Sequence, residues 1–204
     1  YISTLKKYRK YDIDKPLLIG GRTHYINAND EILIKSPNFP KKPALENALI
    51  QSIFGGNSIL FNEKLFLIVN SFKETKIFSH DWWLYILNET FSGKTIFLDD
   101  SKTLYRQHED SIIGGKIGLR QNLRRAVKFF LGDFKKWSDM HCATFENNYD
   151  VLPSDKVKII RNYIMLRSSK NIILRFKLFF KLGLYRQDIF STIIYALGIL
   201  IFRI

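Results

Sequence analysis

Short apolar runs separated by turn-forming residues make up the first half of the chain. The run from Lys15 to Gly20 predicts a short buried strand, and a second strand, Glu31 to Lys35, follows the turn at Asn27–Asp30. Three closely spaced prolines between residues 37 and 43 predict a loop. Apolar residues at helical spacing predict helices over 44–52, over 63–69 after the N-cap candidate Asn62, and from about 79 to 91. Strand-like segments follow at 94–98 and 103–107. Together these elements predict a mixed α/β fold with short strands.

Beyond Gly118 the pattern becomes helical. Apolar residues at helical spacing alternate with Lys and Arg, as in the stretch Arg175–Lys181. The longest apolar run, Ile189 to Phe202, is shorter than the roughly 20 residues that span a bilayer, so it predicts a buried or interfacial helix. The helical segments are 119–137, 154–168, 170–182 and 187–202.

Charge divides the chain at about the same place. Residues 1–115 carry 15 Lys and Arg against 13 Asp and Glu, whereas residues 116–204 carry 17 against 6. We therefore expect a near-neutral domain over 1–115 and a basic helical tail over 116–204 with an anionic partner. Phe and Ile interleaved with Lys favour an anionic membrane surface over nucleic acid, so no nucleic acid is expected. A single cysteine, Cys142, excludes an internal disulfide and a cysteine-based zinc site.

The densest group of candidate functional residues is His80-Asp81-Trp82-Trp83. Asp81 lies at a predicted helix start, where the helix dipole stabilises a carboxylate. Two tryptophans beside an acid are typical of a sugar site, because aromatic faces pack on sugar rings. The same four residues are equally consistent with a capping aspartate beside core tryptophans.

Two further clusters have weaker signals. In Tyr105-Arg106-Gln107-His108, Arg106 and His108 share one face of a predicted strand, where Arg suits a phosphate and His a divalent metal or a phosphate. A solvated strand end would show the same pattern. Gly55-Gly56-Asn57 allows close backbone approach and offers an amide to a hydroxyl, but it is also compatible with an ordinary turn.

The order and spacing of these clusters resemble the bacterial family 2 glycosyltransferases, in particular the rhamnosyltransferase-like group. The resemblance rests on the stretches 54–62, 80–84, 93–96, 104–108 and 113–114, and on Tyr11 to Ile19, which is similar to the stretch after that family's metal-binding motif. It covers about residues 1–115; beyond them it is general and ends near Tyr185-Arg186-Gln187. It implies a GT-A fold, a nucleotide-sugar donor, a divalent metal (Mg or Mn) and a polysaccharide or lipid-linked acceptor at the cytoplasmic face of the plasma membrane.

The resemblance also implies roles for individual residues. Asp81 would be the general base of an inverting transfer, taking the proton of the acceptor hydroxyl. His80, Trp82 and Trp83 would form the acceptor pocket, and Gly55, Gly56 and Asn57 would line the sugar site. Arg106 and Gln107 would contact the substrate near the donor diphosphate. His108 would contact the metal or the diphosphate.

Two departures from the family pattern bear on activity. The family's aspartate-rich metal motif and the strand that holds the nucleotide base would precede residue 1, and Asp12 and Asp14 lie in a different context. The strand beginning at Pro16 usually ends in Ser-Asp in the family, whereas here it runs into Gly20-Gly21-Arg22. We therefore expect little or no transfer activity from this chain alone. The alternative is an inactive remnant that acts as a basic protein binding a membrane surface or nucleic acid.

Overall fold

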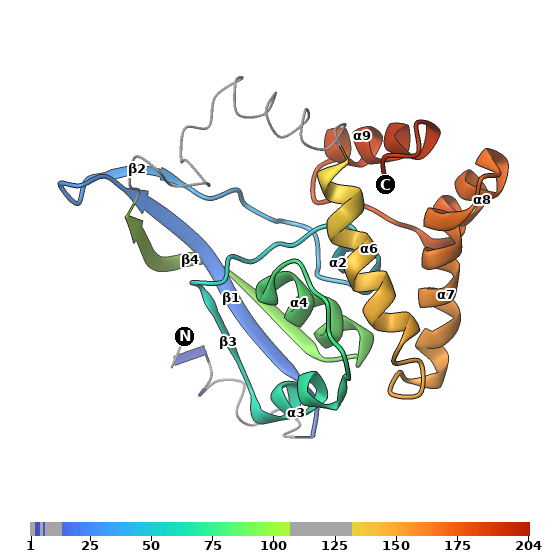
Figure 1. Ribbon diagram of the computed structural model, residues 1–204. Helices are drawn as coiled ribbons and strands as arrows, with labels where there is room; N and C mark the ends of the chain where they lie inside the picture. Colours follow the sequence, from blue (N-terminus) through green and yellow to red (C-terminus); the bar gives the residue numbers. More distant parts are fainter. Residues whose placement is uncertain (1–2, 5, 7–13, 107–131) are drawn as a thin grey trace.

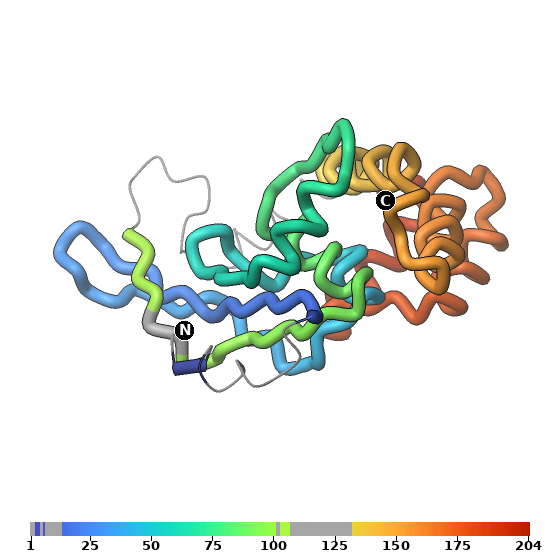
Figure 2. Tube along the Cα trace, turned by 90° about the horizontal axis from the view of Figure 1, so that it is seen from below, coloured from blue at the N-terminus to red at the C-terminus, as the bar shows by residue number. Residues whose placement is uncertain are grey.

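A computed structural model describes residues 3–4, 6, 14–106 and 132–204 of the protein (Figure 1). A sheet with helices packed against it makes up the first part, and a group of longer helices makes up the second. Figures 1 and 2 place these later helices at one end of the sheet and the hairpin of β1 and β2 at the opposite end. The predicted mixed α/β class is confirmed.

The central strand of the sheet is β1, Leu17–Ile26. Along one edge it pairs antiparallel with β3, Ile59–Phe61, through residues 18–20 and with β2, Ile32–Lys35, through residues 24–26. Along the other edge it pairs in parallel with β4, Lys94–Arg106. The sheet is therefore mixed, and β1 is buried over most of its length because it has partners on both sides.

The strands predicted at the positions of β1 and β4 were too short. The strand from Lys15 continues through two glycines to Ile26, and a Cβ atom at Gly20 would lie only 2.2 Å from Cδ1 of Phe54. Glycine is needed there because the phenyl ring occupies the space of a side chain. In place of the two segments predicted over 94–98 and 103–107, the described residues form the single strand β4, Lys94–Arg106, with an irregular register opposite residues 21–23 of β1.

Short helices precede β4. The predicted helix over 44–52 is reduced to α2, Leu45–Ala48, whereas α3, Glu63–Ser71, and α4, His80–Thr90, lie close to the prediction. Asn62 caps α3, as predicted, by accepting a hydrogen bond from the Leu65 amide at 3.2 Å. Both α3 and α4 contact β1 from one side of the sheet (Figure 2).

The later helices are α6, Asp133–Glu146, α7, Ser154–Ser168, α8, Ile172–Leu182, and α9, Ile189–Leu200. The last three were predicted to within two residues at either end. The segment predicted over 119–137 falls largely outside the described residues, and its helix continues nine residues further than predicted, to Glu146. None of the helices in the described ranges is long and apolar enough to cross a membrane.

One hydrophobic core joins the two predicted regions. It contains Trp82 and Trp83 of α4 together with Phe134 and Phe145 of α6 and Tyr195 of α9. Polar contacts fix the same junction: the Tyr163 hydroxyl donates to the Leu49 carbonyl at 2.8 Å, and the Arg186 guanidinium donates to the Ile50 carbonyl at 2.9 Å. The described helices of the basic tail therefore pack into the core of the first region.

Candidate functional site

The start of α4 and the loop before β3 form one surface. The loop turns tightly, because the Ser58 amide and hydroxyl both donate to the Gly55 carbonyl, at 2.9 and 3.1 Å. Gly56 in this turn lies against the imidazole of His80, and a Cβ atom on Gly56 would come within 2.5 Å of Nε2. The structure thus brings together two of the three clusters that the sequence analysis singled out.

Asp81 lies next to this contact, in the first turn of α4. Its carboxylate is half-buried and has no hydrogen-bond or ion-pair partner within the described parts of the chain. Backbone N–H groups at a helix start have no intrahelical acceptors, so this end of α4 attracts negative charge. His80 and Asn57 are exposed beside it. A free carboxylate, an imidazole and an amide are suited to binding hydroxyl groups.

The tryptophans do not line this surface. Trp82 and Trp83 are only 4% and 2% exposed. Trp82 Nε1 donates to the Ala48 carbonyl at 2.7 Å, and its ring packs against Phe134 and His141 at centroid distances of 5.6 and 4.9 Å. Their burial is at odds with the expectation that the two indoles face an acceptor sugar. It fits the alternative interpretation, in which both are core tryptophans. They hold the first turn of α4 against α6.

A different aromatic pair, Phe78 and the half-buried Trp137, involves the segment that leads into α4, and Phe78 precedes Asp81 by three residues. Phe78 is 44% exposed, and its ring stacks on Trp137 of α6 at a centroid distance of 4.0 Å and an interplanar angle of 19°. The Phe78 amide donates to Nε2 of His141 at 3.4 Å, which ties this segment to α6. The pair could not be predicted from the sequence, because Phe78 and Trp137 lie 59 residues apart; the available signal was an apolar residue just before a helix cap.

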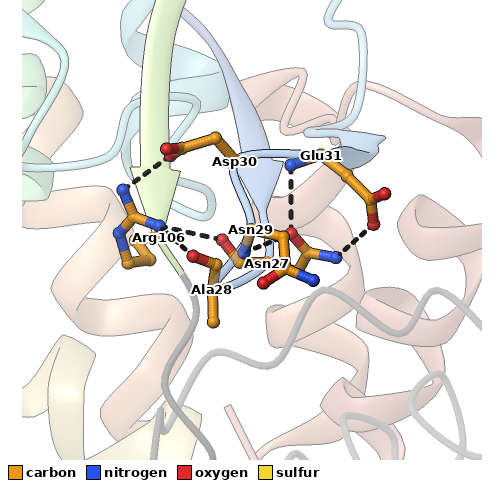
Figure 3. A network of polar contacts seen from close by, with 6 residues as sticks. All are labelled: Asn27, Ala28, Asn29, Asp30, Glu31 and Arg106. Atoms are coloured by element: carbon orange, nitrogen blue, oxygen red, sulfur yellow. Dashed lines mark hydrogen bonds and ion pairs between the residues drawn. The ribbon is translucent and has the colours of Figure 1, made fainter.

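Arg106 lies away from the start of α4. Its guanidinium donates to the carbonyls of Asn27 and Ala28, at 3.1 and 2.9 Å, and pairs with the Asp30 carboxylate at 2.6 Å (Figure 3). It therefore fastens the end of β4 to the turn between β1 and β2. Along β1, the partner of Ile59 (Gly20) and the partner of Arg106 (Ile26) are six residues apart, a separation of roughly 20 Å.

The predicted diphosphate contact of Arg106 stays a prediction, and it would require the guanidinium to leave these three acceptors. Gln107 and His108 lie outside the described residues. Within residues 3–4, 6, 14–106 and 132–204, no three His, Cys, Asp or Glu side chains are grouped to hold a metal ion. The divalent metal that the family resemblance implies therefore stays a prediction.

A cavity of about 460 Å³ lies at the opposite end of α4. Glu89 lines it together with Glu46, Thr95, Lys42, Lys94 and Lys156. Burial raises the pKa of Glu89 to about 7, and the hydrogen bond from the Thr95 hydroxyl and the positive charges of Lys42 and Lys156 oppose the rise. Glu89 was not among the predicted site residues; the available signal was an acid on the same helix face as Trp82 and Tyr85.

His141 is a core residue, only 3% exposed. Burial between the tryptophans lowers its pKa to about 4, and the nearby charge of Arg167 adds to this effect. The imidazole is therefore neutral at pH 7, and Nε2 acts as the acceptor of the Phe78 amide.

Comparison of the chain with protein-family models, with curated proteins and with solved structures gave no match.

Proposed function

We propose that the surface around Asp81 is the acceptor side of an inverting glycosyltransferase of the family 2, rhamnosyltransferase-like kind. The observation that supports this proposal is the contact between Gly56 and His80. Two motifs that the family resemblance assigns to substrate binding, residues 55–57 and 80–83, share one surface. Beside them lies the Asp81 carboxylate, which has no partner among the described residues.

Asp81 acts as the general base. Its carboxylate accepts the proton of an acceptor hydroxyl while that oxygen attacks the anomeric carbon of the donor, and the bond to the nucleoside diphosphate breaks with inversion. A free carboxylate at the start of α4 suits this role, because it has no competing cation in the described parts of the chain. His80 and Asn57 bind neighbouring hydroxyls of the acceptor.

The acceptor sugar stacks on Phe78. An aromatic ring beside the base positions a sugar by covering its apolar C–H face, and Phe78 has one ring face held by Trp137 and a large exposed area. The buried Trp82 and Trp83 contribute indirectly by fixing the start of α4. The acceptor is a polysaccharide or a lipid-linked glycan at the cytoplasmic face of a membrane.

Binding of acceptor glycans to the chain itself tests this proposal, because it does not require the donor. We expect oligosaccharides from a bacterial surface-polysaccharide panel to shift the NMR signals of Phe78 and His80, and Phe78→Ala to weaken binding about tenfold, which corresponds to about 1.4 kcal/mol. Phe66→Ala is the matched control, since Phe66 is similarly exposed on α3. Equal loss in the two variants, or shifts that avoid the start of α4, would contradict the proposal.

A further inference from the structure

The outward side of α9 is entirely apolar. Ile189, Phe190, Ile193, Leu197 and Leu200 recur at spacings of three and four residues, so they form one stripe along the helix. All of them are exposed, with Ile189 and Phe190 at 70%. Tyr195 and Ile199, on the other side of α9, are fully buried in the core. The stripe is therefore additional to the residues that anchor the helix.

The neighbouring helix α8 adds aromatic and basic residues. Its exposed side carries Ile173, Lys177, Phe180 and Lys181, which again lie three and four residues apart. The two helices are in contact, for example through the stacked rings of Phe179 and Tyr195, with centroids 6.2 Å apart. We call the exposed residues of α8 and α9, together with the exposed Ile201 and Phe202 that follow, the α8–α9 face.

Within residues 170–204 the exposed charged residues are almost all positive. Lys170, Lys177, Lys181 and Arg203 are exposed, whereas the single acid of residues 170–204 is Asp188. Asp188 caps α9 by accepting a hydrogen bond from the Ser191 amide at 2.7 Å. The two other arginines of this region, Arg175 and Arg186, are turned inward; the first lies over the Phe202 ring and the second binds the Ile50 carbonyl.

We propose that the α8–α9 face docks on an anionic lipid surface, with the α9 stripe inserted among the acyl chains and the lysines at the level of the headgroups. Large apolar side chains beside lysines are what an interfacial helix requires, because the apolar groups leave water while the long lysine stems let their ammonium groups reach anionic headgroups. A helix of 12 residues is about 18 Å long and lies in the interface. This inference does not depend on glycosyl transfer.

Other occupants of the face fit less well. In a twofold dimer of this chain, each partner would bring the same lysines to the interface, and like charges across an interface are unfavourable. Nucleic acid offers phosphates to the lysines but no acyl chains to the stripe, and its affinity derives mainly from phosphate contacts. An anionic membrane complements both the charge and the apolar side chains.

Flotation with lipid vesicles tests the proposal. We expect the chain to float with vesicles that contain phosphatidylglycerol and to bind pure phosphatidylcholine vesicles more weakly, with each exposed lysine contributing about fivefold. The double variant Phe190→Ser/Leu197→Ser should lose at least about tenfold in vesicle affinity, because each inserted side chain contributes through its buried apolar area. Lys177→Gln/Lys181→Gln should weaken binding to anionic vesicles and leave binding to neutral vesicles unchanged.

Phe66→Ser/Leu67→Ser is the control, since it removes two residues of similar exposure from α3. Circular dichroism of every variant reports whether the fold is retained, and only folded variants are compared. The proposal is overturned if the wild-type chain ignores anionic vesicles, or if the control loses as much affinity as the α9 variant. Sedimentation that shows a lipid-free dimer dissociated by Phe190→Ser/Leu197→Ser would instead assign the face to a second copy of the chain.

Discussion

Replacing Glu89 by glutamine tests the electrostatics of the cavity at the end of α4. The pKa of this carboxyl rises from 4.5 to about 7, chiefly because folding removes it from water. One pKa unit corresponds to about 1.4 kcal/mol, so the ionised carboxylate costs the folded state about 3 kcal/mol relative to the unfolded chain. Between pH 4.5 and 7 the unfolded state releases its proton first, and the free energy of unfolding therefore falls as the pH rises. Glu89→Gln removes this loss while keeping an oxygen that accepts from Thr95.

His141 acts in the opposite direction, because its pKa falls from 6.5 to about 4. The unfolded chain takes up this proton first as the pH decreases, so stability is lost between pH 6.5 and 4, again by about 3 kcal/mol. In the wild-type chain the two contributions nearly cancel between pH 4.5 and 6.5. We therefore expect a flat profile for the wild type over this range and a decline towards acid for Glu89→Gln.

Urea unfolding followed by tryptophan fluorescence at a series of pH values measures both profiles. At pH 8 the Glu89→Gln chain should be more stable than the wild type by up to about 3 kcal/mol, with the gap closing towards pH 4.5. Glu146→Gln, an exposed acid at the end of α6, is the control and should track the wild type. Parallel profiles for Glu89→Gln and the wild type would refute the assignment of a raised pKa to Glu89.

Two other substitutions test how the sheet is held together. Asn62→Ala should lower the free energy of unfolding by about 2 kcal/mol. The Asn62 side chain caps α3 and also forms hydrogen bonds with the backbone of Leu17 and Lys15 at the start of β1. A loss below about 0.5 kcal/mol in urea unfolding would contradict the importance of these contacts. Gly20→Ala should cost about 1–3 kcal/mol through collision with the Phe54 ring, and most of that loss should disappear in a Phe54→Leu background, as a double-mutant cycle would measure.

The hydrophobic pattern was sufficient to predict most elements wherever apolar residues marked the buried side. Helices α7, α8 and α9 follow this rule, and the N-cap residue Asn62 correctly predicted the start of α3. Helix α6 did not, because its buried side carries Ser138, His141 and Thr144. The Thr144 hydroxyl donates to the Lys76 carbonyl at 2.8 Å, a partner 68 residues away. A polar residue with such a distant partner looks like a loop residue in the sequence.

The candidate site was predictable in part. Asp81 was selected because a helix start is a local feature, and its place in the first turn of α4 is confirmed. Whether Trp82 and Trp83 face solvent depends on α6, which folds over them from more than 40 residues away. Arg106 similarly finds its acceptors in the hairpin turn formed by residues 27–30. The burial of the two tryptophans and the acceptors of Arg106 both depend on contacts between segments that are distant in the sequence. The spacing of residues within one segment gives no information about such contacts.

Sugar transfer by an Asp81→Asn variant tests the central claim most directly. Because we expect little or no transfer from residues 1–204 alone, Asp81→Asn is introduced into the protein in its natural host, in its full-length context. Wild type and variant are purified from that host and assayed with radiolabelled nucleotide sugars and a glycan acceptor, and acceptor binding is measured in parallel. A general base contributes roughly 10²–10⁴-fold to the rate, so transfer should fall by that factor while acceptor binding stays within about twofold of the wild type. Transfer by Asp81→Asn at the wild-type rate would show that the proton leaves by another route and would contradict the account.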